Sequence, residues 1–366
     1  MKMNQNLILS LGLACSALLA GACTKVVSGP DAPSFPGQGE VSLTVRLGAP
    51  STKVAAQTEA NEKMIRNVQV FVFRAGSGSD AGNLEVAASA GFDAELDVST
   101  GQYSGLTLKC TTGEREIWAV VNDSRDRTAG ADAIATKADL LAQTHSLADA
   151  RKEKLLMAGT SGVLSLREGK EEIRLEVKRL AASVVLESVR NDFLAPAYRK
   201  AGAFRVEDCY LLNVPGVTNF GGTTEPSALP AESWLARQAA EKAVCAEGVI
   251  YDKVTPKVVE YGASDTTPHS FYAYPNNCAP SEDATWMPRA TLLVLEASLN
   301  TGGEWVKYYY PVVLGGGLQS NRQYRVSLTI HRPGSLDPNV PVRFDDVTPV
   351  IEVQDWDTGE RYDQEI

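Results

Sequence analysis

The chain has 366 residues, of which 44% are hydrophobic and 22% are charged, a balance typical of packed cores and not of a disordered protein. Its formal net charge is −10 and its lysines and arginines form no cluster, which excludes a nucleic-acid partner. The length is that of about two domains of ordinary size.

The N-terminus carries an export signal. An apolar stretch runs from Leu7 to Leu19 and is followed by Ala20, Gly21, Ala22 and Cys23. The apolar run is too short for a membrane-spanning helix, and small residues before a cysteine replace the ordinary cleavage site of a signal peptide. The segment resembles the lipobox of bacterial lipoproteins, in which the cysteine, here Cys23, is acylated with lipid such as palmitate. We therefore predict a lipoprotein signal peptide over residues 1–22; an ordinary signal peptide cut nearby, with Cys23 incidental, is the alternative.

A tether and an isolated strand follow. Residues 24–39 are rich in Pro, Gly and Ser and are expected to be flexible. In residues 40–47, apolar and polar positions alternate, which is typical of a half-buried β-strand. The apolar positions are Val41, Leu43, Val45 and Leu47. Residues 48–61 are again loop-like.

Further strands are predicted up to residue 178. Residues 67–73 are apolar on both faces apart from Asn67 and Gln69, as expected of a central strand. The other candidate strands are residues 103–108, 115–121, 163–166 and 172–178. Between them, residues 131–158 are rich in Ala and Leu, and Thr136 and Asp139 have the spacing of a capping box. This pattern predicts one or two helices packed on the first sheet domain.

A second set of strands begins near residue 182. Its members are residues 183–189, 205–213, 291–299, 305–314, 324–330 and 347–356. Residues 214–288 carry eight prolines and show no clear periodicity, so we expect mostly loop there, with one helix near residues 231–246. The predicted fold is therefore mainly β, with two β-sandwich domains in series that cover residues 54–181 and 182–366.

Few groups in the sequence could carry catalysis. The three histidines, His145, His269 and His331, are far apart, and no HExxH, GxSxG or GxxxxGK[ST] motif occurs. Residues 315–317 predict a glycine turn, and residues 355–359 lack the later ligands of a calcium loop. We therefore expect no enzyme activity, no cofactor and no metal.

The redox state of the cysteines stays open at this stage. Cys110, Cys209, Cys245 and Cys278 follow the predicted lipid-bearing cysteine. They form no CxxC pair, which argues against a zinc site. Disulfides are compatible with an exported chain, and so are buried free thiols, which behave as small apolar side chains.

Sequence blocks in a fixed order link this chain to a known family. After the lipobox, tether and isolated strand come residues 68–73, 113–122, 178–185, 271–272, 309–312, 321–330, 333–334, 337–338 and 351–356. Their order resembles the fimbrillin family, the FimA-like major subunits of the lipoprotein-derived (type V) pili of Gram-negative anaerobes. The resemblance covers nearly the whole chain, with a poor match over residues 214–268, and implies transthyretin-like, Greek-key sandwiches.

The resemblance also implies a maturation step. In that family a trypsin-like protease at the cell surface removes the N-terminal segment together with its first strand, here residues 23–53. The matching basic residue is Lys53, with Arg46 as the second choice because it lies inside the predicted strand. The best-known cleavage in the family follows an arginine, so Lys53 leaves the identity of the protease open.

Loss of the first strand would create a binding site for another chain. It would leave an apolar groove and an unpaired sheet edge, which a strand of a second copy could fill. The expected donor is residues 347–356, through Ile351, Val353 and Trp356. The alternative is that both segments are ordinary sandwich strands that never exchange.

We therefore expect a structural pilin, the stalk subunit of a surface fimbria that begins as an outer-membrane lipoprotein precursor. Its expected partners are other copies of itself, accessory pilins, the maturation protease, the outer membrane through the precursor's lipid, and host or bacterial surface ligands. Two alternatives remain. One is an anchor or accessory subunit that keeps its lipid and is not cut, and the other is a surface lipoprotein that binds glycan or protein without polymerising.

Overall fold

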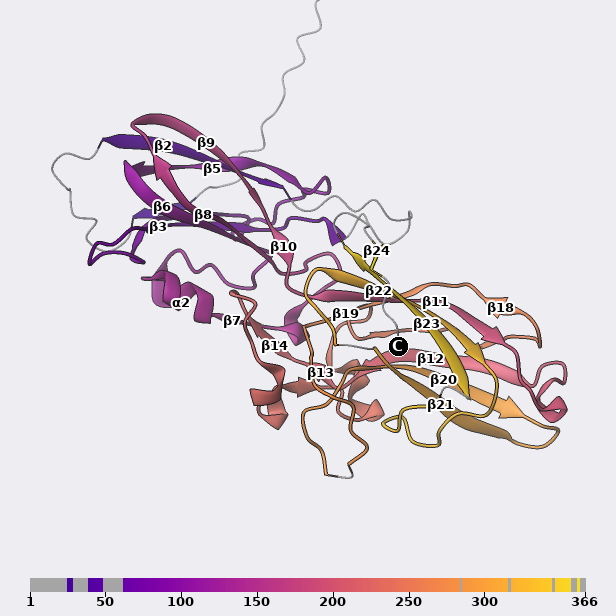
Figure 1. Cartoon of the computed structure of the whole chain (residues 1–366). Coiled ribbons are helices and arrows are strands. Elements are labelled where there is room, and N and C mark those ends of the chain that lie inside the picture. Colours follow the sequence, from indigo (N-terminus) through magenta and orange to yellow (C-terminus); the bar gives the residue numbers. More distant parts are fainter. Residues whose placement is uncertain are drawn as a thin grey trace, which may run out of the picture.

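The computed structural model describes residues 25–28, 39–48, 62–283, 285–314, 317–343, 346–356 and 361–362. These residues form two β-sandwiches, one after the other along the chain, with the short helix α2 (Lys137–Ala142) between them (Figure 1). The prediction of a mainly β fold with two sandwiches is confirmed.

The first sandwich consists of a six-stranded and a three-stranded sheet. The larger sheet has the order β1-β4-β3-β6-β8-β10. Its strands are β1 (Lys25–Ser28), β3 (Val68–Arg74), β4 (Leu84–Ala90), β6 (Gly113–Val121), β8 (Met157–Leu166) and β10 (Lys178–Arg179). The smaller sheet has the order β5-β2-β9. Its strands are β2 (Glu40–Gly48), β5 (Gln102–Thr111) and β9 (Gly169–Glu176).

Two strands of the larger sheet depart from the sequence prediction. β1 lies within residues 24–39, predicted to be a flexible tether, and pairs antiparallel with β4. β4 has the sequence LEVAASA, in which only Val86 is β-branched, so its local strand signal is weak. It is a strand because it pairs on one side with β1 and on the other with β3. Pairing within the sheet therefore overrides local propensity here.

The larger sheet is covered on both faces. Val68, Val70 and Val72 of β3 pack with the apolar residues of β2 in the core of the first sandwich. Phe71 and Phe73 of the same strand are buried in a second core on the opposite face. The prediction that this strand is apolar on both faces is confirmed, because every residue of β3 is buried.

The helix α2 begins with the predicted capping box. The Asp139 N–H donates to Thr136 Oγ1 at 3.1 Å, and the Thr136 N–H donates to Asp139 Oδ2 at 3.0 Å. The rest of residues 131–158 is not α-helical, so the predicted extent of the helical region is wrong. It holds the 3-10 turns η1 (Gly130–Asp132) and η2 (Leu147–Asp149), strand β7 (Thr144–Ser146) and the start of β8.

The second sandwich also has two sheets. One has the order β18-β11-β22-β23-β24, and β19 pairs with β11. Its strands are β11 (Ala182–Asn191), β18 (Ser264–Asp265), β19 (His269–Ala273), β22 (Arg322–Ile330), β23 (Val347–Asp355) and β24 (Arg361–Tyr362). The other has the order β16-β12-β20-β21, and β17 pairs with β12. Its strands are β12 (Phe204–Leu212), β16 (Tyr251–Asp252), β17 (Lys257–Val258), β20 (Leu292–Asn300) and β21 (Trp305–Val313).

Short elements decorate the second sandwich. They are η3 (Pro196–Tyr198), β13 (Val214–Pro215), β14 (Val217–Asn219), η4 (Pro226–Ala228), η5 (Ala231–Ser233), β15 (Trp234–Leu235) and η6 (Ala239–Val244). The helix predicted near residues 231–246 is wrong, because that stretch forms the 3-10 turns η5 and η6 with the two-residue strand β15 between them. A non-helical backbone at Ala243 interrupts η6.

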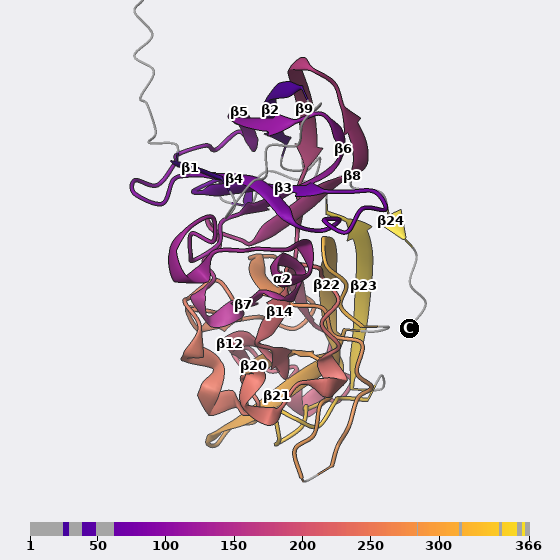
Figure 2. The same cartoon turned by 90° about the vertical axis from the view of Figure 1, so that its left-hand side faces the viewer.

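The two sandwiches are joined by a ladder and by a shared core. β7 pairs antiparallel with β14, with His145 opposite Thr218. The second core extends from Phe71 and Phe73, past Leu140 of α2, into the interior of the second sandwich. Figure 2 shows α2, β7 and β14 between the two sandwiches, and shows β22 and β23 running toward the first one.

Candidate functional site

Strand β2 provides the centre of the small sheet and part of the first core. Val41, Leu43 and Val45 are fully buried, and Leu47 is 1% exposed. β2 is antiparallel to β5 on one side and parallel to β9 on the other. Loss of β2 would therefore uncover the facing side chains of the large sheet and leave backbone groups of both neighbouring strands without partners.

The opposite face of β2 is polar. Arg46 pairs with Glu172 of β9, with Nε and Oε1 2.9 Å apart, and both side chains are more than half exposed. At the start of the strand, Glu40 pairs with Lys109 of β5 at 3.0 Å. Exposed pairs of this kind contribute little stability, but together they connect β2 to both of its neighbours.

Arg46 occupies a β-bulge. The pairing of β2 with β5 shifts between Val45 and Leu47, while Arg46 stays paired with Arg174 of β9. Gly105 faces the bulge with φ +118°, where a Cβ would lie 2.7 Å from the Val45 carbonyl oxygen. The peptide bond after Arg46 thus lies within a paired strand, and a protease could reach it only after local unfolding. Cys23, Lys53 and the predicted signal peptide lie outside the described residues.

Strand β23 contains the predicted donor residues. It pairs antiparallel with β22 along all nine of its residues. On its other side, among the residues that the structure describes, it pairs with the two-residue strand β24. Ile351 and Val353 are buried, while Val350 is 55% exposed. The predicted donor residues therefore face the core of their own domain in this structure.

Just after β23, Trp356 belongs to a buried polar cluster that no sequence signal predicted. Its indole N–H donates to Glu62 Oε2 at 3.0 Å, and the Tyr272 hydroxyl donates to Glu62 Oε1 at 2.7 Å. The ring of Tyr272 stacks on the indole with centroids 5.9 Å apart. The guanidinium of Arg179 lies over the indole, 4.4 Å from its centroid, in a cation–π interaction. We refer to Glu62, Arg179, Tyr272 and Trp356 as the Trp356 cluster.

The Trp356 cluster is buried and connects four distant segments. Arg179, at the end of β10, is fully buried and donates from Nε and Nη2 to the backbone oxygen of Glu62 at 3.2 and 3.1 Å. Burial, reinforced by the Glu62 carboxylate, raises the pKa of Tyr272 well above its ordinary value. The hydroxyl therefore stays protonated and remains a donor. The sequence around each of these four residues shows no pattern that would distinguish the residue from an ordinary core or loop residue.

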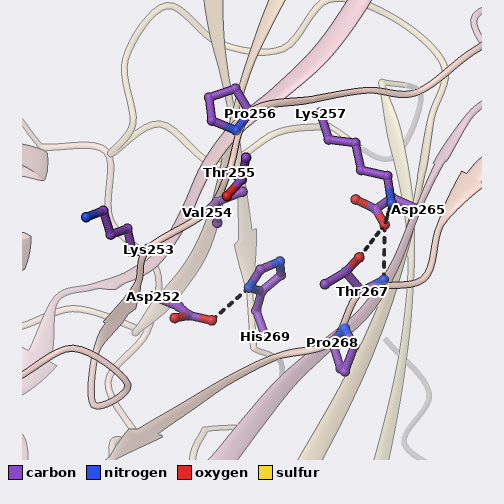
Figure 3. A pocket seen from close by; sticks show the side chains of 10 residues that line it. All are labelled: Asp252, Lys253, Val254, Thr255, Pro256, Lys257, Asp265, Thr267, Pro268 and His269. Atoms are coloured by element: carbon purple, nitrogen blue, oxygen red, sulfur yellow. Dashed lines mark hydrogen bonds and ion pairs between the residues drawn. The ribbon is translucent and has the colours of Figure 1, made fainter.

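A surface pocket of about 420 Å³ opens on the second sandwich (Figure 3). On one side His269 Nδ1 lies 2.9 Å from Asp252 Oδ2, and this hydrogen bond lowers the pKa of Asp252. On the other side Asp265 accepts from Lys257 Nζ at 2.7 Å and from the Thr267 hydroxyl at 2.8 Å. Because Thr267 donates to Asp265 and not to His269, the pocket does not pair a hydroxyl nucleophile with an imidazole base.

The four cysteines of the described chain, Cys110, Cys209, Cys245 and Cys278, are free thiols. Burial raises the pKa of Cys110 and of Cys245 to about 12, which keeps these thiols uncharged and unreactive. Among the residues that the structure describes, no group of three or more His, Cys, Asp or Glu side chains could hold a metal ion. Likewise, no helix in the described part of the chain is long and apolar enough to cross a membrane.

Comparison with known sequences matches part of the chain to a known family. Residues 40–192, which include β11 and the first sandwich apart from β1, match the family of the major fimbrial subunit protein FimA. The predicted resemblance to the fimbrillins is thereby confirmed. A search of curated proteins found no match.

Solved structures show the same fold over most of the chain. A candidate cell adhesion protein from Parabacteroides distasonis ATCC 8503 is 17% identical with a TM-score of 0.58, covering 87% of this chain and 100% of its own. One from Bacteroides eggerthii DSM 20697 is 18% identical with a TM-score of 0.57, covering 89% and 99%. A fimbrilin (FimA) from Porphyromonas gingivalis W83 is 15% identical with a TM-score of 0.54, covering 87% and 98%. At these identities the likeness shows that the chain shares the fold of these proteins over most of its length.

Proposed function

We propose that this chain is the stalk subunit of a fimbria, exported as a lipoprotein through Cys23 and anchored in the outer membrane until a protease cuts it. A trypsin-like protease cuts after Lys53, and the shortened subunit polymerises by strand exchange. The observation that carries the proposal is the position of β2, an apolar strand that fills a core and pairs on both sides, and that lies before the predicted cut in the sequence.

The energy stored in this arrangement is large. Burial of the four apolar side chains of β2 contributes about 1.5–3 kcal/mol each, or about 6–12 kcal/mol together. This is comparable to the total stability of a domain. A cut subunit without β2 therefore regains the most stability when another strand inserts between β5 and β9, as in β-augmentation.

Strand β23 has the pattern of a suitable donor. Val347, Pro349, Ile351 and Val353 repeat the every-second-residue spacing of the apolar positions of β2. Ile351 and Val353 already face a core, so transfer to a neighbouring subunit would exchange one buried environment for another. Because the described part of the chain borders β23 on its outer side with the two-residue strand β24, β23 can leave its sheet by breaking one long and one short ladder.

The test is limited trypsin digestion of the purified precursor, followed by mass spectrometry and native gels. We expect one early cut after Lys53 and a ladder of oligomers that forms only after the cut. The variant Lys53→Ala should abolish this early cut and the ladder, while Arg46→Ala should leave both unchanged. A precursor that resists cutting and stays monomeric would instead support an uncut anchor or accessory subunit. A cut subunit that stays monomeric would support a surface protein that binds glycan or protein.

A further inference from the structure

The Trp356 cluster connects the two ends of the proposed strand exchange. Glu62 follows Lys53 by nine positions (62 − 53), so it lies on the segment that becomes the new N-terminus after the cut. Trp356 directly follows β23, the proposed donor. Both oxygens of the Glu62 carboxylate accept hydrogen bonds from the second sandwich, one from Trp356 and one from Tyr272.

We propose that Glu62 is a latch that holds β23 in its own domain until the chain is cut. This inference rests on the proposed function and adds a regulatory step to it. A single proteolytic event then opens the acceptor groove and releases the donor strand, so that uncut precursors do not exchange strands before they reach the cell surface.

The latch depends on the chain that precedes Glu62. In the precursor this chain leads back to β2, which the small sheet and the first core hold in place. After the cut and the loss of β2, Glu62 lies close to a free chain end, and chain ends are poorly ordered unless something holds them. When Glu62 withdraws, the indole N–H of Trp356 and the hydroxyl of Tyr272 lose a charged acceptor in a buried site, which is costly.

The latch is located where β23 would begin to separate from its sheet. The backbone N–H of Trp356 donates to the carbonyl oxygen of Asn321 at 3.2 Å, at the end of the β22–β23 ladder. Arg179 holds the same end of the strand. Its backbone N–H donates to Asn321 Oδ1 at 3.3 Å, and its guanidinium lies over the indole of Trp356. In Figure 1 this end of β23 lies at the junction with the first sandwich. Loss of the Glu62 contact therefore weakens β23 at the end that adjoins Trp356.

The chain offers a matched pair of variants for a test. Tyr272→Phe removes the hydroxyl that donates to Glu62, and Tyr274→Phe removes a hydroxyl that lies 2.8 Å from His145 Nδ1. Both tyrosines are 2% exposed. Glu62→Gln is the third variant, because an amide offers only one acceptor oxygen for the two donors.

Amide hydrogen exchange of the uncut full-length precursor, read by mass spectrometry on peptides that cover residues 347–356, tests the latch. We expect exchange about tenfold faster in Glu62→Gln and severalfold faster in Tyr272→Phe, with Tyr274→Phe the same as the wild type. Peptides from β12 and β20 should exchange at the wild-type rate in all three variants, which shows that the domain is folded. Equal rates in Glu62→Gln and Tyr274→Phe over residues 347–356 would overturn the latch.

A second measurement tests the latch and strand exchange independently of each other. Wild-type protein is cut with trypsin and measured at a dilution at which native gels show only monomer. Exchange over residues 347–356 should rise to the rate of the uncut Glu62→Gln variant. A ladder at higher concentration without this rise overturns the latch and leaves strand exchange standing. A rise without a ladder supports release of β23 by the cut and overturns strand exchange.

Discussion

Strands β2 and β23 have the same alternation of apolar residues, but they differ in how many long strands pair with them. β2 is a central strand, paired along its length with β5 and β9. β23 has one long neighbour, β22, and one two-residue neighbour, β24. Two long ladders and burial in a core oppose the departure of β2. One long ladder, the short pairing with β24, burial of its apolar residues and the Trp356 cluster oppose the departure of β23. In the proposed mechanism, β2 therefore leaves only after a covalent cut, whereas β23 is released by the loss of an end contact.

The largest expected effect is in the core behind β2. Leu43→Ala in the uncut precursor should lower the free energy of unfolding of the first sandwich by about 2–5 kcal/mol, because it leaves a cavity in a fully buried site. Thr44→Ala, at the next position on the partly exposed face, is the control and should change it by less than about 1 kcal/mol. Urea unfolding of both variants measures the difference. Equal effects would show that β2 is not tightly packed.

The corresponding change in β23 should cost less. Ile351→Ala should destabilise the second sandwich by about 2–3 kcal/mol, at the low end for such substitutions, because this strand has only a short neighbour on one side. Val350→Ala, at a residue that is 55% exposed, should change stability by about 0.5 kcal/mol or less. The same unfolding experiment compares the two variants. A loss for Ile351→Ala larger than that for Leu43→Ala would contradict the contrast between the two strands.

A smaller effect is expected at the junction as the pH falls. Burial lowers the pKa of His145, against the opposing charges of Asp123 and Asp149. The unfolded chain therefore binds the proton more readily than the folded chain. Stability from neutral His145 is fully present above its ordinary pKa of 6.5 and is lost as the pH falls from there toward the folded-state pKa. As the pH falls from 7 to below the folded-state pKa of His145, the His145→Gln variant should lose less stability than the wild type. Thermal unfolding at several pH values measures this difference. Parallel pH profiles would show that His145 does not contribute.

The smallest effect is expected on the exposed face of β2. Glu172→Ala removes the partner of Arg46 and should change stability by less than about 1 kcal/mol, because both side chains are more than half exposed. A double-mutant cycle with Arg46→Ala at low and at high salt measures the coupling, which salt should reduce. A coupling above about 2 kcal/mol would mean that this ion pair holds β2 in place.

Regular strands were predictable because their signal is local. The alternation in residues 40–47 and the two-sided apolar pattern of residues 67–73 depend only on neighbours along the chain, and both became strands of the first sandwich. The capping box of Thr136 and Asp139 is equally local, and it forms. By contrast, β4 depends on its neighbours in the sheet, and the alanine and leucine content of residues 131–158 reflects burial against the second core more than helix formation.

The candidate functional site was only partly predictable, because part of it depends on contacts between segments that are distant in the sequence. The apolar residues of β2 and the buried residues Ile351 and Val353 are visible in the pattern of the sequence. The Trp356 cluster is not, because Glu62, Arg179, Tyr272 and Trp356 come from four segments and only the fold brings them together. That β2 lies between two strands, and so leaves two open edges when it is removed, is likewise a property of sheet order.

The central claim is that β23 of one copy replaces β2 in the next, and zero-length carboxyl-to-amine crosslinking of cut subunits tests it most directly. Isotopically heavy and light subunits are mixed, so that crosslinks between copies are distinguished by mass. Lys109 of β5 loses its partner Glu40 when β2 leaves, and Glu352 alternates with the apolar residues of β23. We predict heavy–light crosslinks from Glu352 to Lys109 or to Lys170 of β9 in the oligomers and none in the uncut precursor. Oligomers in which residues 347–356 crosslink only within their own subunit would contradict the account.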